Sequence, residues 1–223
     1  MTLEEAIAKI KPLDHNAMEI AQKRWDSIAK PLHSLGKLET LLIQIAGITG
    51  NAEVDLSRRG LIAMCADNGV VEEGVTQTGQ EVTAIVAENF LKYDTSVGVM
   101  CKQNHAEIFP VDMGMVTDTK VRTDHKIAYG TQNMTKGPAM TREQAVKGLE
   151  AGIDMVRELN DKGYRILATG EMGIGNTTTS SAVASVLLKQ PVEEMTGRGA
   201  GLTSEGLVCK INAIKKAIAL NEP

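Results

Sequence analysis

The pattern of apolar residues along the chain changes near residue 60. Before that point apolar side chains recur at the three-to-four-residue spacing of helices, and no strand-like run occurs. Thr2 and Glu5 have the spacing of a capping box ahead of a first helix, and Asp14 can cap a second. The spacing predicts a third helix over residues 35–48. Residues 1–50 are therefore expected to form a helical module that is part of a small domain.

After residue 60, short continuous apolar runs alternate with segments of helical spacing. Such runs are typical of parallel strands that are buried on both faces. They occur at residues 61–66, 106–111 and 164–169. The alternation predicts that residues 51–223 form a three-layer α/β/α domain around a mostly parallel, Rossmann-like sheet.

The segments between these strands carry further signals. Thr78 and Glu81 have the spacing of a capping box ahead of one helix. A second helix is predicted over residues 141–160, and its expected apolar face consists of Ala145, Leu149, Ile153 and Val156. Residues 114–140 are expected to form a long irregular connection, with a weak strand near residues 126–129.

A glycine-rich turn over residues 170–179 follows the third strand and precedes a helix. Backbone N–H groups at a helix N-terminus attract anions, and glycine lets a phosphate approach closely. The spacing is close to that of a P-loop, but Asn176 occupies the lysine position, and no G-x-G-x-x-G fingerprint is present. The turn therefore predicts a monophosphate site that contains the carboxylate of Glu171. The alternative is a plain glycine turn with a capping Asn or Thr.

Each of the three strands ends in an acidic residue close to a glycine. Parallel α/β proteins place their chemistry at this edge of the sheet. The three acids could coordinate Mg²⁺, hold a ribose or orient catalytic groups. The alternative is that residues 67–69 form only a turn. The residues concerned are Asp67, Asp112 and Glu171.

Composition narrows the class of protein. The net charge is −4 and no run of Lys and Arg is present, so we expect no nucleic-acid partner. No apolar run approaches the ~20 residues of a membrane helix. The three cysteines lie far apart, which favours a reducing, cytoplasmic location. The four histidines show no metal-ligand spacing, so no metal site is expected.

The last predicted helix covers residues 203–220, and no strand follows it. Its apolar positions are Leu207, Ile211, Ile214 and Ile218. Three strands are few for a parallel sheet, so we expect the α/β domain to be incomplete at its C-terminus. The alternative is that this helix simply closes the domain.

Several motifs together carry a resemblance that covers nearly the whole chain. They lie, in order, at residues 30–39, 66–70, 73–75, 81–83, 130–133, 138–141, 170–178 and 197–202. In these motifs the chain resembles the nicotinate-nucleotide:dimethylbenzimidazole phosphoribosyltransferase family, which builds the lower-ligand nucleotide of cobamides. That resemblance implies transfer of 5-phosphoribose from nicotinate mononucleotide to a benzimidazole nitrogen, with inversion at the anomeric carbon. The products are alpha-ribazole 5′-phosphate and nicotinate, and no cofactor is implied.

The resemblance also implies roles for individual residues. Glu171 matches an active-site carboxylate, and Lys210 matches a lysine near the phosphate. The phosphate and ribose would lie at Gly173, Gly175, Asn176 and Thr177. The slot for the acceptor base would lie near Thr76, Glu81 and Ile85. The substrates are small molecules, and the family resemblance suggests a homodimer.

The resemblance places the main general base, a glutamate, beyond Pro223. We therefore expect these 223 residues to have little transferase activity by themselves. The alternative is a non-catalytic fragment or partner subunit that binds a mononucleotide. The chain also departs from the family pattern at Asn68, where a histidine is common, at residues 77–79, and at Ile85, where a glutamine lies beside the base. An isoleucine cannot hydrogen-bond the base, so Ile85 favours a flat apolar acceptor if it lines the slot, and a phenolic or different aromatic acceptor is a further option. The alternative is that Ile85 only packs into the core.

Overall fold

The computed structural model describes all residues from Met1 to Pro223. The chain divides into two compact units, Met1–Arg58 and Arg59–Pro223. The sequence pattern placed this boundary near residue 50, because the last helical spacing ends there. Residues 51–58 contain no helix or strand and belong to the first unit.

The first unit consists of helices α1 (Leu3–Ala8), α2 (His15–Ser27) and α3 (Lys37–Thr49). The Thr2 hydroxyl and the Glu5 carboxylate form the predicted capping box, and the Asp14 carboxylate accepts from the Ala17 N–H at the start of α2. Helices α2 and α3 pack against each other and bury small side chains, namely Ala17, Ala21 and Ala46. The predicted helical module is therefore confirmed as a set of three helices.

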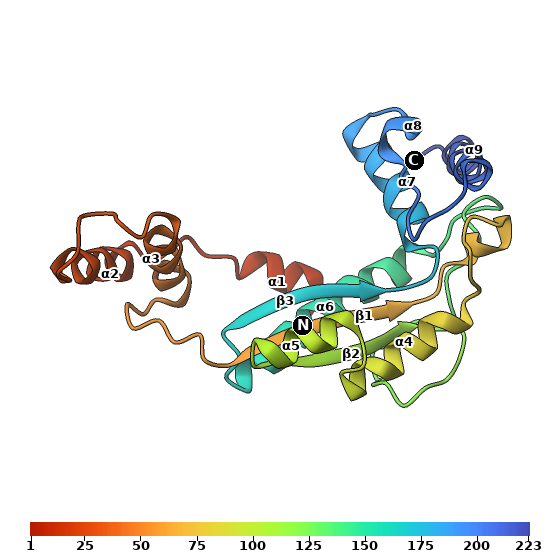
Figure 1. Cartoon of the computed structure of the whole chain (residues 1–223). Coiled ribbons are helices and arrows are strands. Elements are labelled where there is room, and N and C mark those ends of the chain that lie inside the picture. The colour runs from red at the N-terminus through yellow and green to blue at the C-terminus, as the bar shows by residue number, and fades with distance from the viewer. The chain divides into compact units, whose positions relative to one another are not determined.

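The second unit is built on the strands β1 (Arg59–Ala66), β2 (Ala106–Gly114) and β3 (Ile166–Met172). Their order in the sheet is β2-β1-β3, and both pairings are parallel. Figure 1 shows β1 between its two neighbours. The parallel sheet predicted from the three apolar runs is confirmed. Since all three strands run the same way, their carboxyl ends meet at one edge, where the glycine turn follows β3.

Helices cover both faces of this sheet. On one face Ala63 and Cys65 of β1 pack with residues of α4 (Glu81–Lys92), chiefly Ala87 and Phe90. On the other face Ile62 packs with Met155 and Leu159 of α6 (Arg142–Asp161). The short helix α5 (Ser96–Gln103) contacts β2. The alternation of side chains along β1 therefore produces the predicted three-layer α/β/α arrangement.

Two predictions about these helices were wrong. The N-cap of α4 is Gln80, which makes no capping hydrogen bond, so Thr78 and Glu81 form no capping box. The buried face of α6 consists of Ala151, Met155 and Leu159, whereas Leu149 and Val156 are exposed. Helix α6 carries apolar residues at helical spacing on two faces, and only packing against the sheet decides between them.

The connection after β2 is irregular, as predicted, but contains no strand at residues 126–129. It follows the free edge of β2 through separate backbone bonds. The Asp112 N–H donates to the Arg122 carbonyl at 2.8 Å, and the Ile127 N–H donates to the Met113 carbonyl at 2.9 Å. These contacts satisfy backbone groups at the end of β2 without a continuous ladder.

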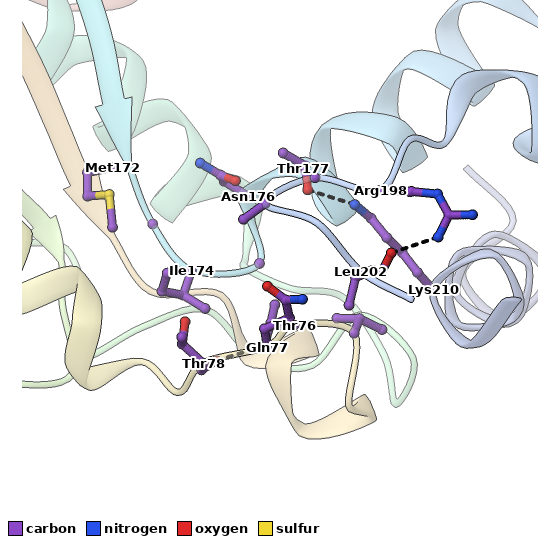
Figure 2. Close-up of a pocket in the computed structure, with 15 residues that line it drawn as sticks. Thr76, Gln77, Thr78, Met172, Ile174, Asn176, Thr177, Arg198, Leu202 and Lys210 are labelled. Atoms are coloured by element: carbon purple, nitrogen blue, oxygen red, sulfur yellow. Dashed lines mark hydrogen bonds between the residues drawn. The ribbon is translucent and has the colours of Figure 1, made fainter. Parts of the chain in front are cut away.

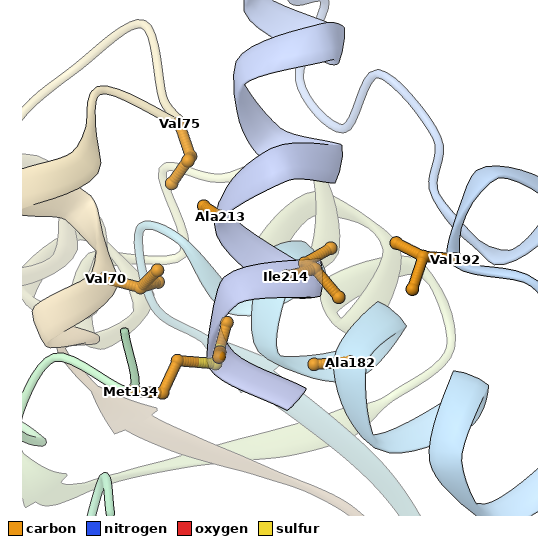
Figure 3. Packing of buried hydrophobic residues seen from close by; sticks show 8 residues of the cluster. Val70, Val75, Met134, Ala182, Val192, Ala213 and Ile214 are labelled. Carbon is orange, nitrogen blue, oxygen red and sulfur yellow. The ribbon is translucent and has the colours of Figure 1, made fainter. Parts of the chain in front are cut away.

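Helices that follow β1 and β3 form a separate cluster. It contains α7 (Asn176–Leu188), α8 (Val192–Met195), α9 (Ser204–Asn221) and the 3₁₀ helix η1 (Gly69–Glu73). Figure 3 shows Ile214 of α9 pointing toward Val192 and Ala182, and Val70 and Met134 belong to the same cluster. Of the apolar positions predicted for this last helix, Ile214 is fully buried, and Ile211 and Ile218 are partly buried against the same cluster. No helix in the structure is both long and apolar enough to cross a membrane.

Candidate functional site

The glycine-rich turn between β3 and α7 forms one wall of a cavity of about 270 Å³. Gly175 is the N-cap of α7, with φ of 90°, and the helix begins at Asn176. The Asn176 N–H donates to the Gly173 carbonyl and the Thr178 N–H to the Gly175 carbonyl. This leaves the Thr177 N–H as the first-turn donor with no partner in the protein. An anion in the cavity would accept from this group and interact with the positive end of the helix dipole.

Lys210 brings a positive charge to the same place. Its side chain comes from α9 and is only 1% exposed, and its ammonium donates to the Thr177 hydroxyl at 2.7 Å (Figure 2). It also donates to the Gly197 carbonyl at 3.2 Å. Burial lowers the pKa of Lys210 below its usual value. No carboxylate pairs with this ammonium. A buried ammonium without an acidic partner is costly, and an anion bound beside it would offset the cost.

The loop at residues 197–202 closes the cavity beside Lys210. Its shape is held by Arg198, whose guanidinium donates to the Leu202 carbonyl at 2.7 Å and to the Ser204 hydroxyl at 3.1 Å. Gly199 adopts φ of 57°, and a Cβ at this position would lie 2.8 Å from Thr177 Oγ1 and 3.4 Å from Lys210 Nζ. Glycine is therefore needed there to let the loop approach the two groups that face the anion site.

Glu171 lies at the exposed edge of the site. The Asn176 amide nitrogen donates to both oxygens of its carboxylate, at 2.6 and 2.8 Å. Asn176 itself lines the cavity. Asn176 therefore connects the Glu171 carboxylate to the cavity in which the phosphate is predicted to bind.

Residues 75–78 form the opposite wall. Val75 of this wall, together with Met172 and Ile174 of the glycine-rich turn, gives the cavity an apolar side. The Gln77 amide donates to the Gly201 carbonyl at 2.6 Å and so connects this wall to the loop beside Lys210. The cavity therefore combines a cationic, hydrogen-bonding end with an apolar side, which suits a phosphorylated ligand that also carries a flat ring.

The strand-end acids do not form a joint site. Asp67 and Asp112 are both 0% exposed, whereas Glu171 is exposed. The Asp67 carboxylate accepts from the Val116 N–H at 2.9 Å, and Asp112 accepts from the Met115 N–H and pairs with Lys126 at 3.1 Å. No group of three His, Cys, Asp or Glu side chains could hold a metal ion. The predicted convergence of three acids was wrong, because two of them turn inward to hold the loop after β2.

The residues predicted for the acceptor slot separate in the structure. Thr76 lines the cavity. Glu81 and Ile85 lie on exposed turns of α4, and neither lines it. Ile85 is 56% exposed, so it is not part of the core. The acceptor slot as a whole stays a prediction.

The sequence did not single out several lining residues as site residues. They include Arg198 and Gly199, although both lie in the motif at residues 197–202 that carried part of the resemblance. Met172 and Ile174 were overlooked because they stand between the glycines of the turn and carry no reactive group. The sequence signal for this loop is that the glycine motif at residues 197–202 directly precedes the last predicted helix.

Comparison with known proteins places these features in a family. A family model described as phosphoribosyltransferase, DBI_PRT, matches residues 10–223. Two proteins named nicotinate-nucleotide–dimethylbenzimidazole phosphoribosyltransferase are similar to the chain. The one from Ruminiclostridium cellulolyticum is 51% identical over 100% of this chain and 64% of its own length, and the one from Clostridium tetani is 47% identical over 99% and 62%.

Solved structures give the same result. The crystal structure of CobT from Thermus thermophilus matches with a TM-score of 0.82 and 36% sequence identity. The match covers 92% of this chain and 62% of that chain. The chain thus spans somewhat less than two thirds of the length of the relatives it matches.

Proposed function

Because the chain belongs to the phosphoribosyltransferase family, we propose that it binds the phosphoribosyl group of nicotinate mononucleotide at the N-terminus of α7. In the reaction that we propose, 5-phosphoribose passes to dimethylbenzimidazole or a related aromatic acceptor. The products are alpha-ribazole 5′-phosphate and nicotinate, as cobalamin nucleotide loop assembly requires. The names of the relatives supply the donor and acceptor of this proposal.

The observation that carries the proposal is the position of Lys210. Its buried ammonium has no acidic partner and lies against the Thr177 hydroxyl, beside the unpartnered Thr177 N–H. A phosphate bound there would accept charge-assisted hydrogen bonds from both residues, each worth roughly 1.5–3 kcal/mol. Gly199 leaves these groups accessible from the cavity.

The remaining parts of the site fit the chemistry of this transfer. The glycosidic bond to the nicotinate nitrogen breaks and nicotinate leaves, a bond forms between the anomeric carbon and the acceptor nitrogen, and the proton on the acceptor passes to a general base. We assign Glu171, held by Asn176, to the ribosyl end of the reaction as its catalytic carboxylate. The apolar wall at Val75, Met172 and Ile174 supplies a surface for a flat aromatic ring.

Two further parts of the proposal concern the protein in the cell. A homodimer is supported by exposed apolar side chains on α7, namely Val183, Leu187 and Leu188. A cytoplasmic location is supported by three free cysteines, of which Cys65 and Cys101 are buried. Light scattering on the purified chain tests the first, since a monomer at micromolar concentration would contradict it.

Calorimetric titration tests the proposed ligand. Nicotinate mononucleotide should bind at least about 100-fold more tightly than nicotinate riboside, because the riboside lacks the phosphate that two charge-assisted bonds would hold. Lys210→Met should remove most of this difference. Lys216→Met is the matched control, since Lys216 lies on the same helix and is exposed. Equal affinity for the two ligands would contradict the proposal.

A further inference from the structure

Ile174 occupies the centre of the glycine turn, and both of its backbone polar groups are held by side chains from elsewhere. Its N–H donates to the Thr83 hydroxyl at 3.0 Å. Its carbonyl accepts from the Asn68 amide at 3.1 Å. Turns at the surface usually satisfy such groups with water, so two protein partners on one residue indicate a turn that is fixed in position.

Thr83 is fully buried in the first turn of α4. Because its oxygen accepts from Ile174, its hydroxyl proton is free to donate. The Asp67 carboxylate interacts with Thr83, and its buried Oδ1 has no hydrogen-bond partner. Burial raises the pKa of Asp67, whereas its interactions with Thr83 and with the Val116 N–H lower it.

Asp67 itself is held by three hydrogen bonds. Its N–H donates to the Gly114 carbonyl at 2.9 Å, and its carbonyl accepts from the Thr131 N–H at 3.0 Å. Its carboxylate accepts from the Val116 N–H at 2.9 Å and interacts with Thr83. A side chain with these restraints has little freedom to move, so it offers Thr83 a fixed partner at the end of β1.

The turn is also packed closely against the end of β1. A Cβ at Gly173 would lie 2.1 Å from the Ala66 carbonyl oxygen, and one at Gly175 would lie 3.2 Å from Asn68 Cβ. The Asn68 amide oxygen in addition accepts from the Thr179 hydroxyl at 3.3 Å. The missing side chains of these glycines therefore face the protein interior, and the N–H groups that follow are directed by the side chains beneath the turn.

We propose that Thr83 is a positioning residue of the phosphate site, holding the Ile174 N–H from the first turn of α4 and so directing the N–H groups at the start of α7. The identity of the ligand in this proposal rests on the proposed function. The restraint of Ile174 by Thr83 does not depend on any ligand. Thr83 does not itself line the cavity and acts through the backbone of Ile174, which does.

Amide hydrogen exchange of Ile174 tests the restraint in the unliganded protein. Thr83→Val keeps the shape of the side chain and removes the hydroxyl, so the Ile174 amide should exchange about tenfold faster. Thr83→Ser restores the hydroxyl and should return exchange to within about twofold of the wild-type rate. Ser185→Ala is the matched control, since the Ser185 hydroxyl is buried and has no partner. Unchanged exchange in Thr83→Val would overturn the proposal.

Calorimetric titration with nicotinate mononucleotide tests the consequence for binding. Thr83→Val should raise Kd about tenfold, while Thr83→Ser and Ser185→Ala stay near the wild-type value. Equal Kd values for Thr83→Val and the wild type would overturn the positioning role. If Thr83→Val does not fold, Thr83→Ala serves for both measurements. No binding by the wild type would overturn the proposed function, whereas Ile174 exchange would still decide for or against Thr83.

Discussion

The Lys210 ammonium lies 2.7 Å from the Thr177 hydroxyl and thereby joins α9 to the first turn of α7. The two residues are 33 positions apart in the sequence, and both helices belong to the cluster packed around Ile214. The core of this cluster therefore fixes the distance between the helix N-terminus and the charge that faces it. Binding at this site should depend on charge, on space and on the position of the turn, and each can be tested separately.

The charge of Lys210 makes ligand binding depend on pH. Burial lowers its pKa below the ordinary value of 10.5, so the ammonium loses its proton at a lower pH than an exposed lysine does. Affinity for nicotinate mononucleotide should therefore fall as pH rises from 7 toward 10, and Lys210→Met should bind weakly with no such slope. Calorimetry across this range measures the effect, and parallel pH profiles for the two proteins would contradict it.

The same lowered pKa affects the stability of the unliganded protein. Between the folded-state pKa of Lys210 and 10.5, the unfolded chain binds more protons than the folded one, so the free energy of unfolding should rise with pH. Lys210→Met should lack this rise. Urea denaturation at several pH values compares the two, and an identical pH dependence would show that Lys210 titrates normally.

Asn176→Asp tests the effect of negative charge at the mouth of the site. A second carboxylate beside Glu171 repels a phosphate, so affinity for nicotinate mononucleotide should fall by about tenfold or more, or ~1.4 kcal/mol. An aspartate in the first turn of a helix costs little, so the free energy of unfolding should change by less than about 1 kcal/mol. Asn212→Asp, on an exposed turn of α9, is the control. Unchanged affinity in Asn176→Asp would place the phosphate elsewhere.

Gly199→Ala tests the space that the loop leaves. Both Gly199 and Gly74 have positive φ, of 57° and 69°, so alanine at either position introduces a similar backbone strain of about 1–2 kcal/mol. Only at Gly199 would the new Cβ meet Thr177 and Lys210, since nothing lies within 4 Å of a Cβ at Gly74. Gly199→Ala should therefore weaken binding at least about fivefold more than Gly74→Ala. Equal losses in titrations of the two variants would mean that only strain matters.

The buried pair of Lys126 and Asp112 should stabilise the fold rather than take part in the reaction. Lys126→Met leaves the fully buried Asp112 carboxylate without its cation, which should cost about 3–5 kcal/mol of unfolding free energy. Lys136→Met breaks an exposed pair with Glu72 and should cost at most about 1 kcal/mol. Equilibrium denaturation measures both. Similar costs would show that burial of the first pair has no energetic effect.

Much of the fold could be predicted from local patterns. The capping residues Thr2 and Asp14 act within one helical turn, and β1 contains a continuous apolar run at residues 61–66, so neither needs tertiary context. The face of α6 could not be predicted in this way, because Leu149 and Met155 both satisfy helical spacing. Which of the two residues is buried depends on which side of the helix meets the sheet.

Some features of the site could likewise be predicted from local patterns, and others could not. The turn after β3 is readable because a strand, glycines and a helix N-terminus follow one another in the chain. The inward orientation of Asp67 depends on Val116 and Thr83, which are distant from it in the sequence, and no local pattern encodes it. Ile85 likewise fits an apolar stripe of α4, yet it is exposed because the sheet contacts another side of that helix.

A crystal structure with nicotinate mononucleotide tests the central claim most directly. The phosphate should lie at the start of α7, with one oxygen within about 2.7–3.2 Å of the Thr177 backbone nitrogen and another at the same distance from Lys210 Nζ. The nicotinate ring should lie toward the apolar wall that includes Met172 and Ile174. A phosphate bound away from both Thr177 and Lys210 would contradict the account.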